Sequence, residues 1–328
     1  MILVTGATGF LGHNLVPALV AAGYPVRALV RPTSDATFLK RLGVEIAVGD
    51  LADRESVLQA MDGSHSVVHG GGLFRLWGDA RAFERSNVEG TAYMLEAALR
   101  HNVERFIHIS SIAAIGRPEP GRVIDESHPL RPLDDYQRSK FDAENVVRMY
   151  HLTAQLPVII LRAGAFYGPW GRYAWNRLFF EDPLKGLRIQ VHSGRRLTFP
   201  VFVPDVAQAV LSAFTRGRPG EVYNVCGDPI SHREANRIIS RHAGISPRRV
   251  NVPDRLLVTL AREMARLAER SGREPYFPLS LEPYVFCDWP VTSLKARNEL
   301  GFEPTPFDQG ACRTVEWYRE IGFLKNRR

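Results

Sequence analysis

The sequence predicts an α/β fold: a parallel sheet with helices wound on both of its faces, followed by a smaller C-terminal lobe. Short apolar runs alternate with helical patterns over residues 1–115, and a glycine-rich turn follows the first of these runs. After Pro169 this rhythm gives way to aromatic residues and prolines. We therefore expect one domain over residues 1–168, with part of its core continuing beyond it, and a lobe mainly over residues 169–328.

The expected strands are short runs of apolar and β-branched residues without helical spacing. They are Ile2–Thr5, Pro25–Arg31, Val44–Val48, His65–His69, Arg105–Ser110 and Val158–Leu161. Apolar residues at helical spacing predict helices between and after them. These helices are Leu11–Ala22, Ala80–His101, Gln137–Tyr150 and Arg255–Arg270.

The helix Arg255–Arg270 carries one apolar stripe, with arginine and glutamate on its other sides. The stripe consists of Leu256, Leu260, Met264 and Leu267. Such a stripe is typical of a helix packed on a core and, less often, of a helix lying on a membrane surface. We expect core packing here.

Composition narrows the class of protein. The 328 residues are 45% hydrophobic, and no uninterrupted apolar run is long enough for a transmembrane helix. The net charge of +7 is spread along the chain rather than grouped in one run, so an anionic cofactor or substrate explains it as well as nucleic acid does. Three cysteines without metal or disulfide spacing indicate no metal site and a reducing, cytoplasmic location.

The strongest local motif is TGATGFLG, which lies between the first strand and the first helix. Gly6 permits a sharp turn, Gly9 lets the backbone approach a pyrophosphate, and Gly12 lets the helix pack closely on the sheet. The helix N-terminus then presents amide groups and a positive dipole to phosphates. The motif therefore predicts a dinucleotide site.

The residue at the end of the second strand indicates which dinucleotide binds. An acidic residue about 20 positions after the turn would bind the adenosine ribose of NAD. This chain has Arg31 there, followed by Thr33 and Ser34. A guanidinium pairs with a 2′-phosphate, so NADP(H) is favoured and NAD(H) stays possible.

A serine and a tyrosine–lysine pair follow the first five strands. Ser111 follows the fifth strand directly, and Tyr136 and Lys140 are one helical turn apart. The Lys140 ammonium can lower the pKa of the Tyr136 phenol, which is near 10 without such a neighbour. The three residues therefore predict proton transfer to or from a substrate oxygen that Ser111 orients.

Together and in this order, the three motifs resemble the extended branch of the short-chain dehydrogenases/reductases, a Rossmann-fold group. NVEGT, LRAGAFYGP, FVPDVAQA and KARNELGFEP extend the resemblance over nearly the whole chain. It implies that Ser111 rather than Ser110 is the catalytic serine, with Tyr136 as general acid/base and Lys140 as its partner. The dinucleotide-binding residues it implies are Gly6, Thr8, Gly9, Phe10, Leu11, Gly12, Arg31, Asp50, Leu51, Asn87, Tyr136, Lys140, Ala163 and Gly164.

Several polar residues near these motifs also have a structural explanation. Asn87 either supports the active-site geometry or only ties a loop, while Asp205 is expected to bridge backbone amides in the lobe. His69 and His108 are expected to be packed core residues. Gly70 and Gly71 stand where family members usually carry small residues such as alanine, which predicts a looser loop here.

The resemblance also ranks the reactions. Ile112 and Ala113 stand where the related dehydratases carry acidic residues, and Ala165 stands where nucleotide-sugar epimerases place an asparagine. The chain is most similar to the dihydroflavonol-reductase-like, 3β-hydroxysteroid-dehydrogenase-like and hopanoid-associated epimerase-like groups. This implies hydride transfer to or from a carbonyl or secondary alcohol. A nucleotide-sugar epimerase and a non-catalytic NADP-sensing protein are the alternatives.

Aromatic residues follow the last matched strand and suggest the kind of substrate. Trp170, Tyr173, Trp175, Phe179 and Phe180 either line a pocket for an apolar, ring-bearing molecule or form the lobe core. The expected partner is such a small molecule, with neither nucleic acid nor a membrane span. By analogy with the family, a homodimer through the helices 80–101 and 137–150 is possible.

Overall fold

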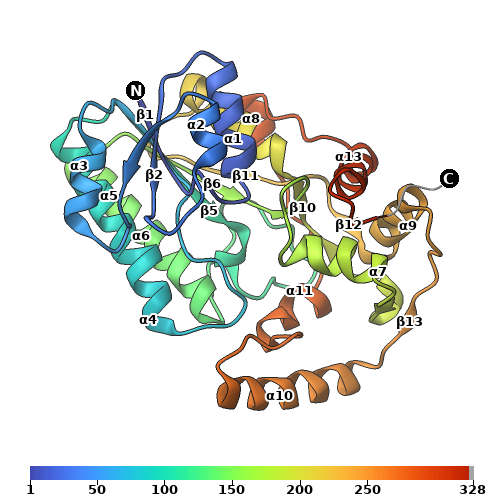
Figure 1. Cartoon of the computed structure of the whole chain (residues 1–328). Helices are drawn as coiled ribbons and strands as arrows, with labels where there is room; N and C mark the ends of the chain where they lie inside the picture. Colours follow the sequence, from blue (N-terminus) through green and yellow to red (C-terminus); the bar gives the residue numbers. More distant parts are fainter. Residues whose placement is uncertain (325–328) are drawn as a thin grey trace.

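The computed structural model of the chain describes residues 1–324, and its centre is a sheet of seven parallel strands (Figure 1). The strand order is β11–β6–β5–β4–β1–β2–β3. The six expected strands are confirmed with small shifts at their ends, and β11 comes from beyond Pro169. The bounds are β1 Ile2–Thr5, β2 Val26–Val30, β3 Glu45–Val48, β4 Ser66–His69, β5 Arg105–Ser111, β6 Val158–Ala163 and β11 Val222–Val225.

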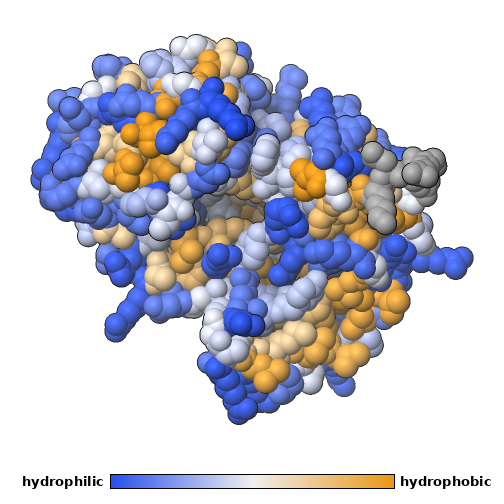
Figure 2. All heavy atoms as spheres, viewed as in Figure 1, coloured by the Kyte–Doolittle hydropathy of each residue, from blue (hydrophilic) through white to orange (hydrophobic). Residues whose placement is uncertain are grey.

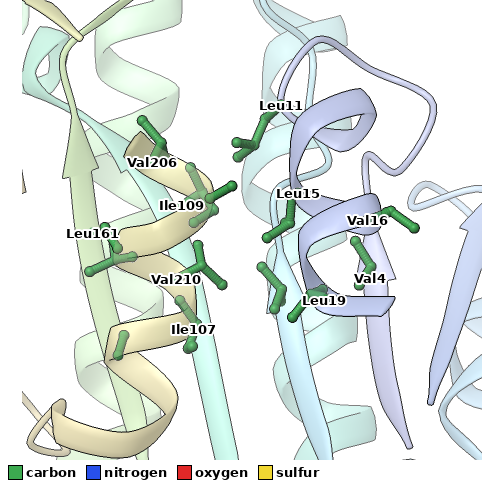
Figure 3. Close-up of a cluster of buried hydrophobic side chains, with 14 of the residues drawn as sticks. Val4, Leu11, Leu15, Val16, Leu19, Ile107, Ile109, Leu161, Val206 and Val210 are labelled. Atoms are coloured by element: carbon green, nitrogen blue, oxygen red, sulfur yellow. The ribbon is translucent and has the colours of Figure 1, made fainter. Parts of the chain in front are cut away.

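Helices cover both faces of this sheet, which is the doubly wound arrangement expected. On one face, α1 (Gly12–Ala21) and α8 (Val203–Arg216) bury Leu15, Leu19 and Val210 against β1, β5 and β6 (Figure 3). On the other face lie α3 (Arg54–Met61), α5 (Gly90–Arg100) and α6 (Asp135–Ala154). The strands are apolar on both sides because both sides are covered.

The order of the strands fixes where a ligand can enter. The chain runs outward from β1 through β2 to β3, and then crosses back to place β4 on the other side of β1. In open α/β sheets such a switch leaves a crevice at the carboxyl ends of the strands. The glycine turn and the end of β4 meet at this crevice.

The expected helix over residues 80–101 is present with one irregular turn. It consists of α4 (Ala80–Phe83), the π-helical turn η1 (Glu84–Glu89) and α5. Single π turns within α-helices are frequent at functional sites. Asn87 lies in this wide turn and is buried.

The C-terminal part of the chain forms a lobe beside the carboxyl edge of the sheet. Its short strand pairs are β7 (Ala165–Tyr167) with β10 (Pro200–Phe202), β8 (Ile189–Gln190) with β13 (Val250–Asn251), and β9 (Leu197–Thr198) with β12 (Ile230–Ser231). Its other elements are η3 (Arg177–Glu181), α7 (Asp182–Leu184), η4 (His192–Gly194), α9 (His232–Ala243), α10 (Asp254–Ser271), η5 (Leu279–Leu281), α11 (Glu282–Phe286) and α13 (Phe307–Glu320). Two short helices, α2 (Thr37–Arg41) and α12 (Leu294–Leu300), pack with the sheet domain, and η2 (Ile112–Ile115) follows β5. The division at residue 168 stays a prediction.

The prediction that the stripe on α10 packs into the core is wrong. Leu256, Leu260 and Leu267 are 61%, 43% and 62% exposed, and the buried side of α10 holds Ala261 and Ala268. The apolar arc of this helix is wider than the surface that the lobe offers it. Met264 of the stripe is half-buried beside these alanines, and the three leucines of the stripe are left on the outside.

The three cysteines are free, and no cluster of histidine, cysteine or carboxylate side chains in residues 1–324 could hold a metal ion. Within the same residues, no helix has the length and apolar character required to cross a bilayer.

Candidate active site

A cavity of about 750 Å³ opens at the carboxyl edge of the sheet, between the glycine turn and the lobe. Figure 2 shows the molecule hollowed between its two parts. All but one of the predicted site residues line this cavity. The exception is Gly12, which lies beneath the turn where α1 packs on the sheet.

The glycine turn forms the floor of the cavity and needs glycine for two reasons. Gly6 has φ +72°, and a Cβ there would lie 2.7 Å from the carbonyl oxygen of Gly70. A Cβ at Gly12 would collide with the carbonyl oxygen of Ala7. The turn therefore packs tightly on its own helix and on the neighbouring strand end, and it leaves bare backbone and the start of α1 facing the cavity.

The loop after β4 is tight, so the expectation of a looser loop is wrong. A Cβ at Gly71 would lie 2.8 Å from both Leu51 Cδ1 and Thr5 Oγ1, whose hydroxyl oxygen accepts from the Gly71 amide at 2.8 Å. At Gly70 the nearest atom would be 3.4 Å away. Alanine could therefore replace Gly70 but not Gly71.

One end of the cavity carries a cation and a carboxylate at the ends of β2 and β3. Arg31 and Ser34 line it from one side, and Asp50 and Leu51 from the other. Among residues 1–324, the exposed Arg31 guanidinium makes no hydrogen bond or ion pair. Asp50 is held in place, because its Oδ1 accepts from the Ala52 amide at 3.0 Å and its own amide donates to Ser56 Oγ at 3.1 Å. The free guanidinium is available to an anion.

The opposite part of the cavity holds Ser111 and Tyr136. Asp134 caps α6 by accepting from the Gln137 amide at 2.8 Å, which places Tyr136 in the first turn of the helix. The Tyr136 ring packs 4.8 Å from the Phe74 ring, measured between centroids. Burial raises the pKa of Tyr136 to about 12, against the opposing effect of a hydrogen bond with Ser111. The phenol is therefore protonated at neutral pH.

Lys140 lies one turn further along α6, but it does not act on Tyr136 as expected. Its ammonium donates to the carbonyl oxygen of Ile109 at 2.8 Å, and it is not among the groups that shift the pKa of Tyr136. Burial lowers the pKa of Lys140 itself to about 8, while the charge of Glu144 raises it. The structure therefore shows no lowering of the phenol pKa by Lys140, whose ammonium is bound to the backbone of β5.

Below these residues lies a buried ion pair that the motifs did not reveal. Arg162 of β6 donates to both carboxylate oxygens of Glu144 at 2.8–3.2 Å, and Ser110 donates to Glu144 Oε1 at 2.7 Å. The two charged side chains are 2% and 0% exposed. An arginine inside the apolar run VIILRA was the one available signal, since a buried charge needs a partner.

Asn87 ties a loop, which is the structural role considered for it. Its Oδ1 accepts from the Leu73 amide at 2.6 Å, and its Nδ2 donates to the Leu73 carbonyl at 3.0 Å and to Ser139 Oγ at 2.8 Å. It thereby fixes residues 70–78, which we call the strap, against α6. Because Ser139, which Asn87 contacts, also donates to the Tyr136 carbonyl, this role is compatible with support of the active-site geometry.

The strap crosses from the sheet domain to the lobe. The Leu76 amide donates to the hydroxyl of Tyr173 at 2.8 Å, and Ser280 Oγ donates to the Leu76 carbonyl. The Tyr173 hydroxyl in turn donates to Glu274. Residues from three distant segments therefore close the cavity above Tyr136, an arrangement for which the sequence offered no local signal.

The aromatic residues after β7 divide between the two roles considered for them. Trp170, Tyr173, Trp175 and Phe179 line the cavity, whereas Phe180 is fully buried in the lobe core. With Phe74, Leu281 and Val285, they make this part of the cavity mainly apolar. Such a wall offers apolar ring surfaces to a bound molecule.

His232 is a polar exception in this wall. It begins α9 and lines the cavity beside Phe179, with ring centroids 5.3 Å apart. Its Nε2 is buried and makes no hydrogen bond to any described residue. Burial lowers its pKa to about 4, so the ring is neutral and can exchange a hydrogen bond with a neutral oxygen.

The remaining histidine and aspartate predictions agree with the structure. His69 and His108 are buried within the sheet, where His69 bridges the hydroxyl groups of Thr5 and Thr91. Asp205 accepts from the amide and the hydroxyl of Thr305, both at 2.7 Å, and so joins α8 to the segment before α13.

The chain is similar to known proteins over nearly its whole length. A family model described as the NAD dependent epimerase/dehydratase family matches residues 2–226. Sterol demethylase protein B of Methylococcus capsulatus is 33% identical, with 98% of this chain and 99% of that protein covered. The 4-hydroxy-2-methyl-3-oxo-4-farnesyl-3,4-dihydroquinoline-1-oxide ketoreductase of Stigmatella aurantiaca is 32% identical, with 91% of this chain and 90% of that protein covered. The crystal structure of gox2253 is 32% identical, with 99% of both chains covered and a TM-score of 0.85.

Proposed function

The chain belongs to the NAD dependent epimerase/dehydratase family, and within it we propose a dehydrogenase/reductase that acts on a carbonyl or secondary alcohol of an apolar, ring-bearing substrate. The observation that carries the proposal is one cavity lined by the glycine turn, Ser111, Tyr136 and an aromatic wall. The sterol and farnesyl-bearing names of the two relatives agree with an apolar substrate. The alternative is a nucleotide-sugar epimerase, in which the hydride returns to the substrate and the coenzyme shows no net change.

The residues present fit a nicotinamide dinucleotide. Bare backbone at the glycine turn with the start of α1 would hold the pyrophosphate, and Asp50 with Leu51 the adenine. Lys140 would hold the nicotinamide ribose. When bound, the nicotinamide supplies or accepts the hydride.

The proton chemistry belongs to the protein. In the reductive direction, the protonated Tyr136 phenol donates its proton to the substrate oxygen, and Ser111 donates a hydrogen bond to the same atom. The Tyr136 pKa of about 12 keeps the phenol protonated until the substrate oxygen develops negative charge. The strap and the aromatic wall exclude water and hold the apolar body of the substrate in place.

The proposal is tested with ketones, sterols, their alcohols and nucleotide sugars, each assayed with both coenzymes. With a reductase, the absorbance of the reduced nicotinamide decreases in proportion to the product formed. Product without any net absorbance change would favour the epimerase. Dinucleotide binding without turnover of any compound would favour the non-catalytic NADP-sensing alternative.

For the coenzyme we propose NADP(H), because the Arg31 guanidinium lies at the cavity edge and has no partner among the residues that the structure describes. Arg31→Asp is expected to change the ratio of kcat/KM for NADP(H) over NAD(H) roughly 10- to 100-fold in favour of NAD(H). The reason is the loss of a charge-assisted hydrogen bond and the introduction of a like charge. Arg41→Asp, an exposed change on α2 away from the cavity, is the control. An unchanged ratio would remove Arg31 from the site.

For the substrate we propose a second neutral oxygen, placed to bind His232. His232→Leu is expected to raise KM about tenfold for compounds that carry this oxygen, since Nε2 has no hydrogen-bond partner among residues 1–324. Compounds without it should be turned over equally well by both proteins. The measurement is a set of matched ketones with and without a remote hydroxyl, and an equal effect on both would contradict the prediction.

The proposal also includes a cytoplasmic homodimer. Leu99 on α5 and Met149 and Leu152 on α6 are 41%, 49% and 73% exposed on the two helices expected to pair. A dimer would cover these side chains, which lie away from the cavity.

A further inference from the structure

We propose that α10 is a docking helix that lies on an anionic lipid surface. The starting point is the leucine ridge, defined as Leu256, Leu260 and Leu267. These side chains are spaced by one and then two helical turns, so they share one face, and each is between 43% and 62% exposed. Figure 2 shows apolar surface gathered along the lower edge of the molecule, where α10 lies.

The ridge is exposed because α10 is held to the lobe by its other side and by its ends. Ala261 and Ala268 face inward, and α10 packs on η5. At its start Asp254 pairs with His192 at 2.9 Å, and just after its end Glu274 accepts from the Tyr173 hydroxyl. The helix is therefore fixed in an orientation that keeps the leucines outside.

Charge indicates what covers the ridge. At helical spacing, Arg255, Arg262, Arg266 and Arg270 form an exposed row on the side next to the leucines. Arg266 pairs with Glu263, which lies between Leu260 and Leu267 on the leucine face. The segment 248–274 holds seven arginines against four carboxylates, in a chain of net charge +7. A ridge of leucine beside a row of arginine is the pattern of helices that lie at the surface of anionic bilayers. A second copy would carry the same positive excess.

The position of α10 would bring the lipid surface close to the cavity. η5 and α11 follow it directly, and Leu281, Tyr284 and Val285 of these elements line the cavity. A bilayer beneath α10 would therefore lie beside the apolar end of the cavity. This use rests on the proposed function, whereas the docking itself does not depend on any substrate.

The test is co-sedimentation of the full chain with vesicles of phosphatidylcholine alone or of equal parts phosphatidylcholine and phosphatidylglycerol. We expect binding to the anionic vesicles only, weakened by raising sodium chloride from about 0.1 M to about 0.5 M. Leu256→Gln/Leu260→Gln/Leu267→Gln should reduce the bound fraction about tenfold or more. The matched control is Val48→Gln/Val123→Gln/Leu294→Gln, which changes side chains that are 66%, 56% and 60% exposed elsewhere.

Three results would overturn the proposal. The first is an absence of binding to anionic vesicles, and the second is equal binding by the leucine variant and the natural chain. The third is concentration-dependent self-association without lipid that the leucine variant abolishes, since a second copy would then cover the ridge. Circular dichroism and dinucleotide affinity measured without vesicles show whether each variant is folded. Because no reaction is assayed, a failure of the proposed function would leave these outcomes unchanged.

Discussion

Tyr136→Phe is expected to lower kcat about 10²- to 10⁴-fold while the dissociation constant of the dinucleotide changes less than about twofold. Phenylalanine keeps the ring that packs against Phe74 and Phe83, at centroid distances of 4.8 and 6.1 Å, and removes only the hydroxyl. The cavity floor at the glycine turn is untouched. The measurements are turnover followed by reduced-nicotinamide absorbance and a fluorescence titration of the coenzyme.

The matched control is Tyr150→Phe, the same chemical change further along α6 and outside the cavity lining. It should leave both quantities unaltered. If Tyr136→Phe retained most of its turnover, the phenol would not be the proton donor. If it lost turnover and coenzyme binding together, the separation between the glycine turn and the proton-transfer residues would be wrong.

The parts of the fold that the sequence predicts well are those set by local physics. The parallel strands are continuous apolar runs because helices cover both faces, and the turn at Gly6 requires a positive φ that favours glycine. The spacing of Tyr136 and Lys140 places both on one face of α6 whatever the lobe does. These features needed no knowledge of distant contacts.

The errors arise where distant segments decide the outcome. The spacing of leucines in α10 correctly indicated an amphipathic helix, but it could not show how much of the arc the lobe would cover. The glycines after β4 predicted a loosely packed loop, yet Leu51 and Thr5 leave no space for a side chain at Gly71. The pKa of Tyr136 is raised by burial, and the Lys140 ammonium is bound to the backbone of β5 instead of lowering it.

The Glu144–Arg162 pair links stability to the site, and this link was also invisible in the sequence. The two residues come from α6 and β6, and both are buried with their charges in contact. Glu144 is one turn beyond Lys140, and its charge raises the pKa of the lysine against the opposing effect of burial. A change at Glu144 should therefore alter both the free energy of unfolding and the protonation of Lys140.

Glu144→Gln is expected to lower the free energy of unfolding by about 3–5 kcal/mol, since it leaves Arg162 charged and unpaired in the core. Because Glu144 raises the pKa of Lys140, its removal should lower that pKa below about 8. Lys140 is protonated below its pKa, so activity that needs the ammonium should then decline at a lower pH than in the natural chain. Denaturant unfolding and a pH profile of kcat/KM check the two effects separately. Glu144→Met/Arg162→Met, which removes both charges, should recover much of the stability but keep the shifted profile. An unshifted profile in both variants would show that Glu144 supports only the fold.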